Sequence, residues 1–211
     1  MATSTSTTTR LEAFSDAVIA IAITLLILEV KTPHVRDGDL ARALGDQWPS
    51  YVAYALTFVV IGIMWINHHR IFELIARTDR GLLFVNLLML MGIAFLPFPT
   101  ALLADYVVDG WSNAHVAAAV YSATMTWIGL TFLGLWLYID HHRELLAPEV
   151  DPAVIAASIR RTVPGPCLYG ASIALAFVSA EACLVVYALL AAYFAIGWLP
   201  EWILRNEPNV D

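Results

Sequence analysis

The chain has 211 residues, of which 60% are hydrophobic and only 14% are charged, and its mean hydropathy is +0.72. Soluble domains carry roughly 25% charged residues, so the composition excludes an ordinary soluble domain and indicates an integral membrane protein. The net charge of −7 excludes a nucleic-acid partner, because the chain has no basic patch to neutralise phosphates.

Six segments are long and apolar enough to cross a bilayer as helices, which takes about 20 residues each. The sequence therefore predicts an all-α integral membrane protein with short loops, except at residues 31–48 and 140–160. Residues 1–9 are expected to be a disordered tail, residues 10–204 the transmembrane domain, and residues 205–211 a C-terminal tail. The six helices are expected at about 11–30, 49–70, 81–104, 112–139, 161–180 and 182–203.

Two of the expected spans contain prolines. Pro97 and Pro99 fall near the end of the third span, and Pro164 and Pro166 fall at the start of the fifth. Proline removes a backbone hydrogen bond and clashes with the preceding turn, so we expect kinks or late helix starts there.

The basic residues predict the orientation. Lys31, Arg36 and Arg42 lie on one side of the expected membrane, whereas the larger group lies on the other side. Cytoplasmic loops carry the excess of Lys and Arg, so both termini of this multi-pass chain are expected in the cytoplasm. The larger group consists of Arg10, Arg70, Arg77, Arg80, Arg143, Arg160, Arg161 and Arg205.

Charged residues open the first span. Arg10, Glu12 and Asp16 lie within two helical turns of one another, immediately before an apolar run. A carboxylate so close to hydrocarbon is costly unless it is paired or hydrated, which makes Asp16 a candidate functional residue.

Beyond Asp16, four residues at helical spacing share one face of the first span, namely Ile21, Thr24, Leu25 and Leu28. A charged entrance followed by this aliphatic stripe suits the wall of a gated pore. It suits equally well an anchor helix that packs against its neighbours.

The end of the second span carries a polar group at the same expected depth as Arg10, Ser15 and Asp16. Trp65 and His69 are four residues apart and share a helix face. The group, which also includes Asn67 and His68, either tethers the first helix to the second or is solvated at the membrane surface.

Two pairs of adjacent histidines, His68-His69 and His141-His142, raise the alternative of a metal-dependent membrane oxidoreductase, because imidazole suits zinc and iron. Adjacent residues on a helix point about 100° apart, however, so each pair offers one ligand per face and no chelate. We expect neither a structural metal nor a cofactor, and no enzyme activity.

Arg10, Phe14, Ser15 and Asp16 form an Arg-x-x-x-Phe-Ser-Asp pattern that opens a Leu-rich helix ending in Leu-Glu-Val. This pattern resembles the lysosomal potassium channel family of the transmembrane protein 175 type, and more closely its single-repeat bacterial members. Trp65 and His69 after a long second span fit the same resemblance, which covers essentially the whole chain.

The resemblance implies a potassium-permeable, modestly selective cation channel in the cell membrane of a bacterium. It implies a homotetramer with the first helix of each subunit around a central pore. Ile21 would then form the constriction, with Leu25 and Leu28 as further apolar rings and Thr24 as a polar ring. Arg10, Phe14, Ser15 and Asp16 would hold the helix in place, with Trp65 and His69 as partners.

A secondary transporter remains the main alternative. Such proteins bind their substrate near the middle of the bilayer, on broken helices, and the proline-containing third and fifth spans suit that architecture. A leak-type channel would instead use copies of the first helix around an axis, because one helix cannot enclose a pore.

Overall fold

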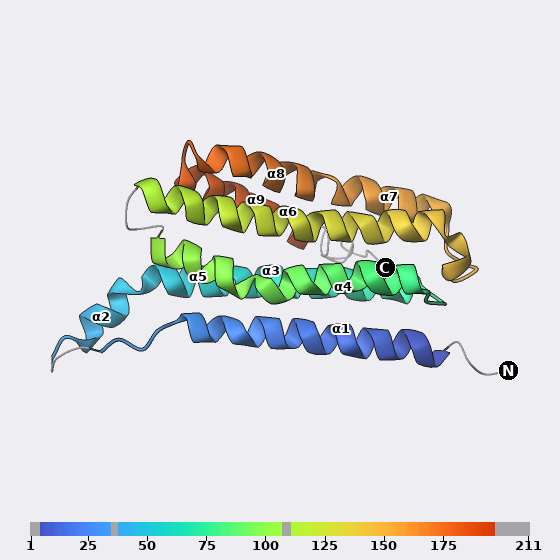
Figure 1. Ribbon diagram of the computed structural model, residues 1–211, viewed down its shortest axis with the longest axis horizontal. Coiled ribbons are helices and arrows are strands. Elements are labelled where there is room, and N and C mark those ends of the chain that lie inside the picture. Colours follow the sequence, from blue (N-terminus) through green and yellow to red (C-terminus); the bar gives the residue numbers. More distant parts are fainter. Residues whose placement is uncertain (1–4, 35–37, 107–110, 197–211) are drawn as a thin grey trace, which may run out of the picture.

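The computed structural model describes residues 5–34, 38–106 and 111–196. In this part of the chain the long helices lie side by side along one axis, and successive passes run in opposite directions (Figure 1). The elements are α1 (Thr5–Leu25), the 3-10 helix η1 (Leu26–Glu29), α2 (Leu40–Asp46), α3 (Trp48–Glu73), α4 (Arg80–Phe95), α5 (Pro97–Tyr106), α6 (Trp111–His141), the 3-10 turn η2 (Arg143–Leu145), α7 (Pro152–Thr162), α8 (Pro164–Ala176) and α9 (Ala180–Ile196).

Within the described residues, four stretches are long and apolar enough to cross a membrane, and they agree with the first four predicted spans. They are Thr8–Glu29, Trp48–Glu73, Arg80–Tyr106 and Asn113–His141. The remaining apolar helices are shorter. The 13 residues of α8 extend about 20 Å, less than the roughly 30 Å of a hydrocarbon core. The predicted sixth span reaches residue 203, and its last part lies outside the described residues.

The prolines affect both of the predicted spans that contain them, the third and the fifth. The third span divides into α4 and α5 at Leu96, immediately before Pro97. The fifth begins late, because α8 starts at Pro164, and Val163 separates it from the preceding helix α7. Both breaks follow from the missing proline N–H and the clash of the ring with the preceding turn.

Three helical segments differ from the sequence prediction. Helix α1 begins at Thr5, so residues 5–9 continue the first span as a helix. Helices α2 and α7 lie in the two segments expected as loops. The start of α7 carries a local signal, because the Asp151 side chain accepts a hydrogen bond of 2.8 Å from the Ala153 N–H and Pro152 occupies the first turn.

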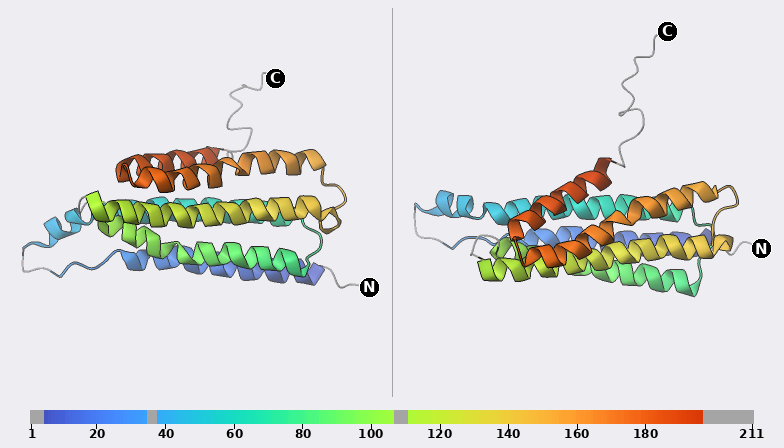
Figure 2. Two further views of the ribbon diagram at one scale, coloured as in Figure 1. Left: turned by 45° about the horizontal axis from the view of Figure 1, so that its top comes forward. Right: turned by 90° about the horizontal axis from the view of Figure 1, so that it is seen from above.

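Helix α6 lies at the centre of the bundle, with α4 and α5 on one side and α7, α8 and α9 on another (Figure 2). Small residues on α6, including Ala117 and Ala118, are buried and allow close helix packing. Tyr187 of α9 reaches this core, where its hydroxyl is 2.6 Å from Ser122 Oγ and donates a 2.9 Å hydrogen bond to the Ala118 carbonyl.

One end of the bundle, which we call the basic end, contains the α3–α4 and α6–α7 connections with Arg77 and Arg143 (Figure 1). The two connections are joined by backbone hydrogen bonds. The Ala76 N–H donates to the Leu145 carbonyl at 2.8 Å, and the Ala147 N–H donates to the Leu74 carbonyl at 2.9 Å. These hydrogen bonds therefore fix α3 and α4 to α6 and α7 at the basic end.

Candidate functional site

Helix α1 has two distinct faces. One is a buried stripe spaced by three and four residues, which packs against α3 and α4. The other face is exposed although it is strongly apolar: Ile21 is 58% exposed and Leu28 is 70% exposed. The buried stripe consists of Leu11, Ser15, Ile19, Ala22 and Leu26.

A buried polar chain fixes α1 to its neighbours near the basic end. Asn86 of α4 donates a 2.9 Å hydrogen bond to Ser15 Oγ of α1, and its Oδ1 lies 3.0 Å from His68 Nε2 of α3. All three side chains are at most 1% exposed. A buried polar group without a partner costs about 1–3 kcal/mol, so these hydrogen bonds select one arrangement of the three helices.

Asp16 makes a second link between the same helices. The indole N–H of Trp65 donates a 2.9 Å hydrogen bond to Asp16 Oδ1. The ring of His69 stacks on Trp65 with centroids 6.1 Å apart, and His69 Nε2 lies 3.5 Å from Glu73 Oε1. The carboxylate at the mouth of the apolar run is therefore paired with the second long helix.

The structure thus brings together Ser15, Asp16 and Trp65 but distributes the other residues of the pattern differently. His69 touches Trp65 and Glu73, and His68 occupies the buried chain. Phe14 is 50% exposed, and Arg10 is exposed without an ion pair to any of the described residues. Arg10 and Phe14 therefore belong to the outward side of α1.

Sequence reasoning missed Asn86 altogether and chose His69 over His68. A signal for His68 was present, because it falls at helical spacing with Ile61, Met64 and Ile71, which are all buried. Asn86 stands alone in an apolar run, and such a residue shows no partner until the helices are placed together.

The histidine pairs are not arranged as metal ligands. His68 stacks on Phe72 with ring centroids 4.3 Å apart, and His141 meets His142 edge to face. Across residues 5–34, 38–106 and 111–196, no group of three or more His, Cys, Asp or Glu side chains is placed to hold a metal ion.

The four residues expected to line an ion path lie together on the outward face of α1 and its continuation η1. Ile21, Leu25 and Leu28 are exposed aliphatic side chains, and Thr24 lies among them. The Thr24 hydroxyl donates within its own helix, to the Ala20 carbonyl at 3.0 Å and the Ile21 carbonyl at 2.9 Å. Because the hydroxyl proton is used there, the remaining lone pairs of Oγ1 are available to an outside donor or cation.

Residues 10–97 match the family model described as the endosomal/lysosomal potassium channel TMEM175. A protein of Streptomyces collinus that is named a potassium channel is 48% identical over 192 residues, which cover 90% of this chain and 93% of that protein. A protein of Chamaesiphon minutus with the same name is 44% identical over 194 residues, which cover 90% and 95%.

The fold is also shared with a solved structure. The crystal structure of a lysosomal potassium-selective channel TMEM175 homologue from Chamaesiphon minutus matches with a TM-score of 0.82 and 41% identity. The match covers 92% of this chain and 100% of that one. With relatives of this identity and coverage, the chain belongs to the TMEM175 family.

Proposed function

We propose that this chain is the subunit of a potassium-permeable cation channel in which α1 of several copies surrounds a central pore. The observation that carries the proposal is the outward face of α1, which is apolar and exposed while the opposite face is bonded to α3 and α4. The names of the bacterial relatives support potassium as the permeant ion. By the resemblance the assembly is a homotetramer, with no cofactor and no enzyme activity.

The proposed constriction is a ring of Ile21 side chains, followed by rings of Leu25 and Leu28. Narrow apolar rings control conduction by excluding water, because an ion without its hydration shell cannot enter a dry segment. The free lone pairs of Thr24 would offer one oxygen from each subunit to a partly dehydrated cation. Such a pathway has fewer fixed oxygens than a carbonyl filter, so we propose modest selectivity.

We propose that the chain crosses the membrane six times, with α8 and α9 as the last two passes, in the cell membrane of a bacterium. The basic end would face the cytoplasm together with both termini, because Lys and Arg are enriched in cytoplasmic loops. The outward position of Arg10 and Phe14 supports a role for them in contacts between subunits.

A secondary transporter is the second candidate, and one observation favours it. The break between α7 and α8 at Pro164 borders a pocket inside the subunit, and broken helices carry the substrate sites of many transporters. Transport through such a site saturates with substrate and needs a coupling partner, whereas flux through a leak channel needs neither.

The test is cation flux into liposomes that contain the purified protein, with potassium compared against sodium and Ile21→Asn compared with the unaltered chain. Hydration of the narrow point should raise potassium flux about tenfold, as expected if the barrier falls by about 1.4 kcal/mol, and reduce the preference for potassium. Leu130→Asn is the matched control, because Leu130 is 52% exposed on α6.

Unchanged flux in Ile21→Asn would show that the constriction is not formed by Ile21 of α1. An equal rise in Leu130→Asn would show that a polar group on any exposed helix face makes the membrane leak. Flux that saturates and requires a second solute would favour the transporter.

A further inference from the structure

A pocket of about 440 Å³ lies inside the subunit between α3, α6, α7, α8 and α9. Its volume is in the range of sites that bind small molecules. The residues that line it on α3 include Ile63, Asn67 and Arg70, which lie on a different face of that helix from Trp65 and His68. The pocket is therefore separate from the α1 face proposed as the ion path.

The bend between α7 and α8 forms one wall of the pocket. Gly165 and Pro166 line it immediately after the break, and Gly129 of α6 lies against Pro166. A side-chain carbon on Gly129 would come within 3.1 Å of the Pro166 ring, so α6 and α8 touch at this point. The space opens on the basic side of this contact, where α7 carries Ser158 and Arg161 along the pocket.

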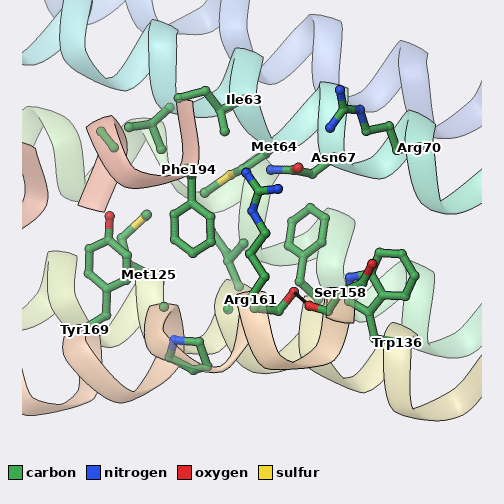
Figure 3. Close-up of a pocket in the computed structure, with 18 of the residues that line it drawn as sticks. Ile63, Met64, Asn67, Arg70, Met125, Trp136, Ser158, Arg161, Tyr169 and Phe194 are labelled. Carbon is green, nitrogen blue, oxygen red and sulfur yellow. Dashed lines mark hydrogen bonds between the residues drawn. The ribbon is translucent and has the colours of Figure 1, made fainter. Parts of the chain in front are cut away.

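The charged side chains gather in one part of the pocket, where Trp136 lies beside Ser158 (Figure 3). Ile63, Met125 and Tyr169 lie at one end, whereas Arg70 and Ser158 lie toward the other. The side chain of Arg161 extends from α7 across the pocket toward Asn67. The pocket therefore has an apolar interior and a cationic part nearer the basic end.

The cationic part is not neutralised within the described residues. Arg70 and Arg161 form no ion pair there, and the one carboxylate that lines the pocket, Glu73, lies 3.5 Å from His69 Nε2. Both arginines are exposed residues, so their charges are accessible from outside the subunit. With two guanidinium groups against one carboxylate, the pocket favours an anion with a single negative charge.

The dimensions suit one acyl chain. On α3 the lining runs from Val60 to Glu73, a distance of about 20 Å at 1.5 Å per residue. One leaflet of the hydrocarbon core is about 15 Å thick, so the lining extends from near the middle of the bilayer to the headgroup level. Basic pockets between transmembrane helices on the cytoplasmic side are places where anionic lipid headgroups bind.

We infer that this pocket binds an anionic phospholipid from the leaflet at the basic end. The phosphate accepts hydrogen bonds from Arg161 and Arg70, and one acyl chain lies between α3, α6 and α9 toward Met125 and Tyr169. Arginine suits this role because its planar group makes two parallel hydrogen bonds to phosphate oxygens. The inference is independent of the ion pathway, since binding is measured without flux.

The test uses the full chain in a neutral detergent with dioleoyl phosphatidylglycerol or dioleoyl phosphatidylcholine, which differ only in the headgroup. Native mass spectrometry then counts the lipid molecules retained per subunit. We expect selective retention of phosphatidylglycerol, and a loss of about fivefold in affinity in Arg161→Gln, from about 1 kcal/mol per arginine. Arg160→Gln is the matched control, because Arg160 neighbours Arg161 but does not line the pocket.

A second variant tests whether the lipid occupies the pocket itself. Ser158→Trp fills space at the polar end and should reduce retention of both lipids without removing a charge. Equal retention of the two lipids by the unaltered chain would overturn the inference. So would an equal loss in Arg160→Gln and Arg161→Gln, which would indicate attraction to the basic surface in general.

Discussion

Helices α1 and α6 are both long enough to cross a membrane, yet they are held in the subunit in different ways. In the apolar window of α6, 50% of the residues are buried, against 28% in that of α1. Helix α6 packs along its length against helices on several sides. Helix α1 contacts its neighbours along one stripe, where the adjacent residues Ser15 and Asp16 form side-chain hydrogen bonds to α4 and α3.

This difference follows from the solvent. In a bilayer, lipid is as apolar as the helix surface, so an apolar face is not driven into the protein as it would be in water. Helix position then depends on close packing and on polar groups that need partners. Small residues allow the close packing of α6, whereas hydrogen bonds to Asn86 and Trp65 position α1.

The largest effect is expected when the buried chain loses its central member. Asn86→Leu removes both of its hydrogen bonds and leaves Ser15 and His68 buried without partners. We expect the free energy of unfolding to fall by about 2 kcal/mol. Reversible unfolding of the purified protein in mixed micelles, followed by circular dichroism, measures this change.

Asn67→Leu is the matched control for that variant. Asn67 is partly buried on α3 and makes no side-chain hydrogen bond to the residues that the structure describes, so its replacement should change stability little. Equal losses in the two variants would mean that the hydrogen bonds of Asn86 do not hold α1 in place.

A smaller effect sharpens the same comparison at Asp16. Asp16→Ala and Trp65→Phe each remove one partner of a single hydrogen bond at 2.9 Å. We expect each to cost about 1 kcal/mol, and the double variant to cost no more than either one. Fully additive losses in this double-mutant cycle would show that the two side chains act independently and that α1 has one polar link instead of two.

The smallest effect concerns the contact between α6 and α4, the helix to which α1 is bonded. Asp79 begins α4, where it accepts a 2.8 Å hydrogen bond from the Leu82 N–H and a 2.7 Å hydrogen bond from the Tyr138 hydroxyl of α6. Burial acts to raise the pKa of Asp79, but the hydrogen bonds from Leu82, Tyr138 and Gly81, together with the nearby His142, outweigh it and hold the pKa below its ordinary value of 3.8. The carboxylate form is therefore the stabilising one.

Because the folded pKa of Asp79 is depressed, its contribution is complete at neutral pH and is lost as the pH falls through that lower value. Asp79→Asn should cost about 0.5 kcal/mol at pH 7, a small loss because the site is partly solvated. The difference from the unaltered chain should shrink below about pH 3.8. A difference that stays constant over this range, measured by thermal unfolding, would show that the charge of Asp79 does not contribute.

Much of the fold follows from hydropathy, because a membrane requires long apolar runs and each backbone group must bond within its own helix. The first four spans and both proline breaks were predictable for that reason. Helix α7 was not, since it has only 11 residues, ends in Arg160 and Arg161, and has Ile155 as its one fully buried residue. Its Asp-Pro start was the local signal, and it indicated a helix that the membrane criterion does not require.

The site was predictable where one helix carried the information. The shared face of Ile21, Thr24, Leu25 and Leu28 depends only on helical spacing. The equal depth of Asp16 and Trp65 left two alternatives, a tether between the helices or solvation at the membrane surface. The choice between His68 and His69 depends on how α3 is rotated, and the role of Asn86 depends on which helix lies against α1. Both are properties of tertiary packing, which one sequence does not express.

The change from α1 to η1 at Leu26 alters the geometry of the outward face. A 3-10 helix has three residues per turn and rises about 2.0 Å per residue, so Leu28 lies about 6 Å beyond Leu25 and nearly in line with it. A continued α-helix would place Leu28 about 4.5 Å beyond and turned by about 60°. In a ring of subunits the two leucine layers would therefore stack in register, and an ion would pass them in succession along a straight wall.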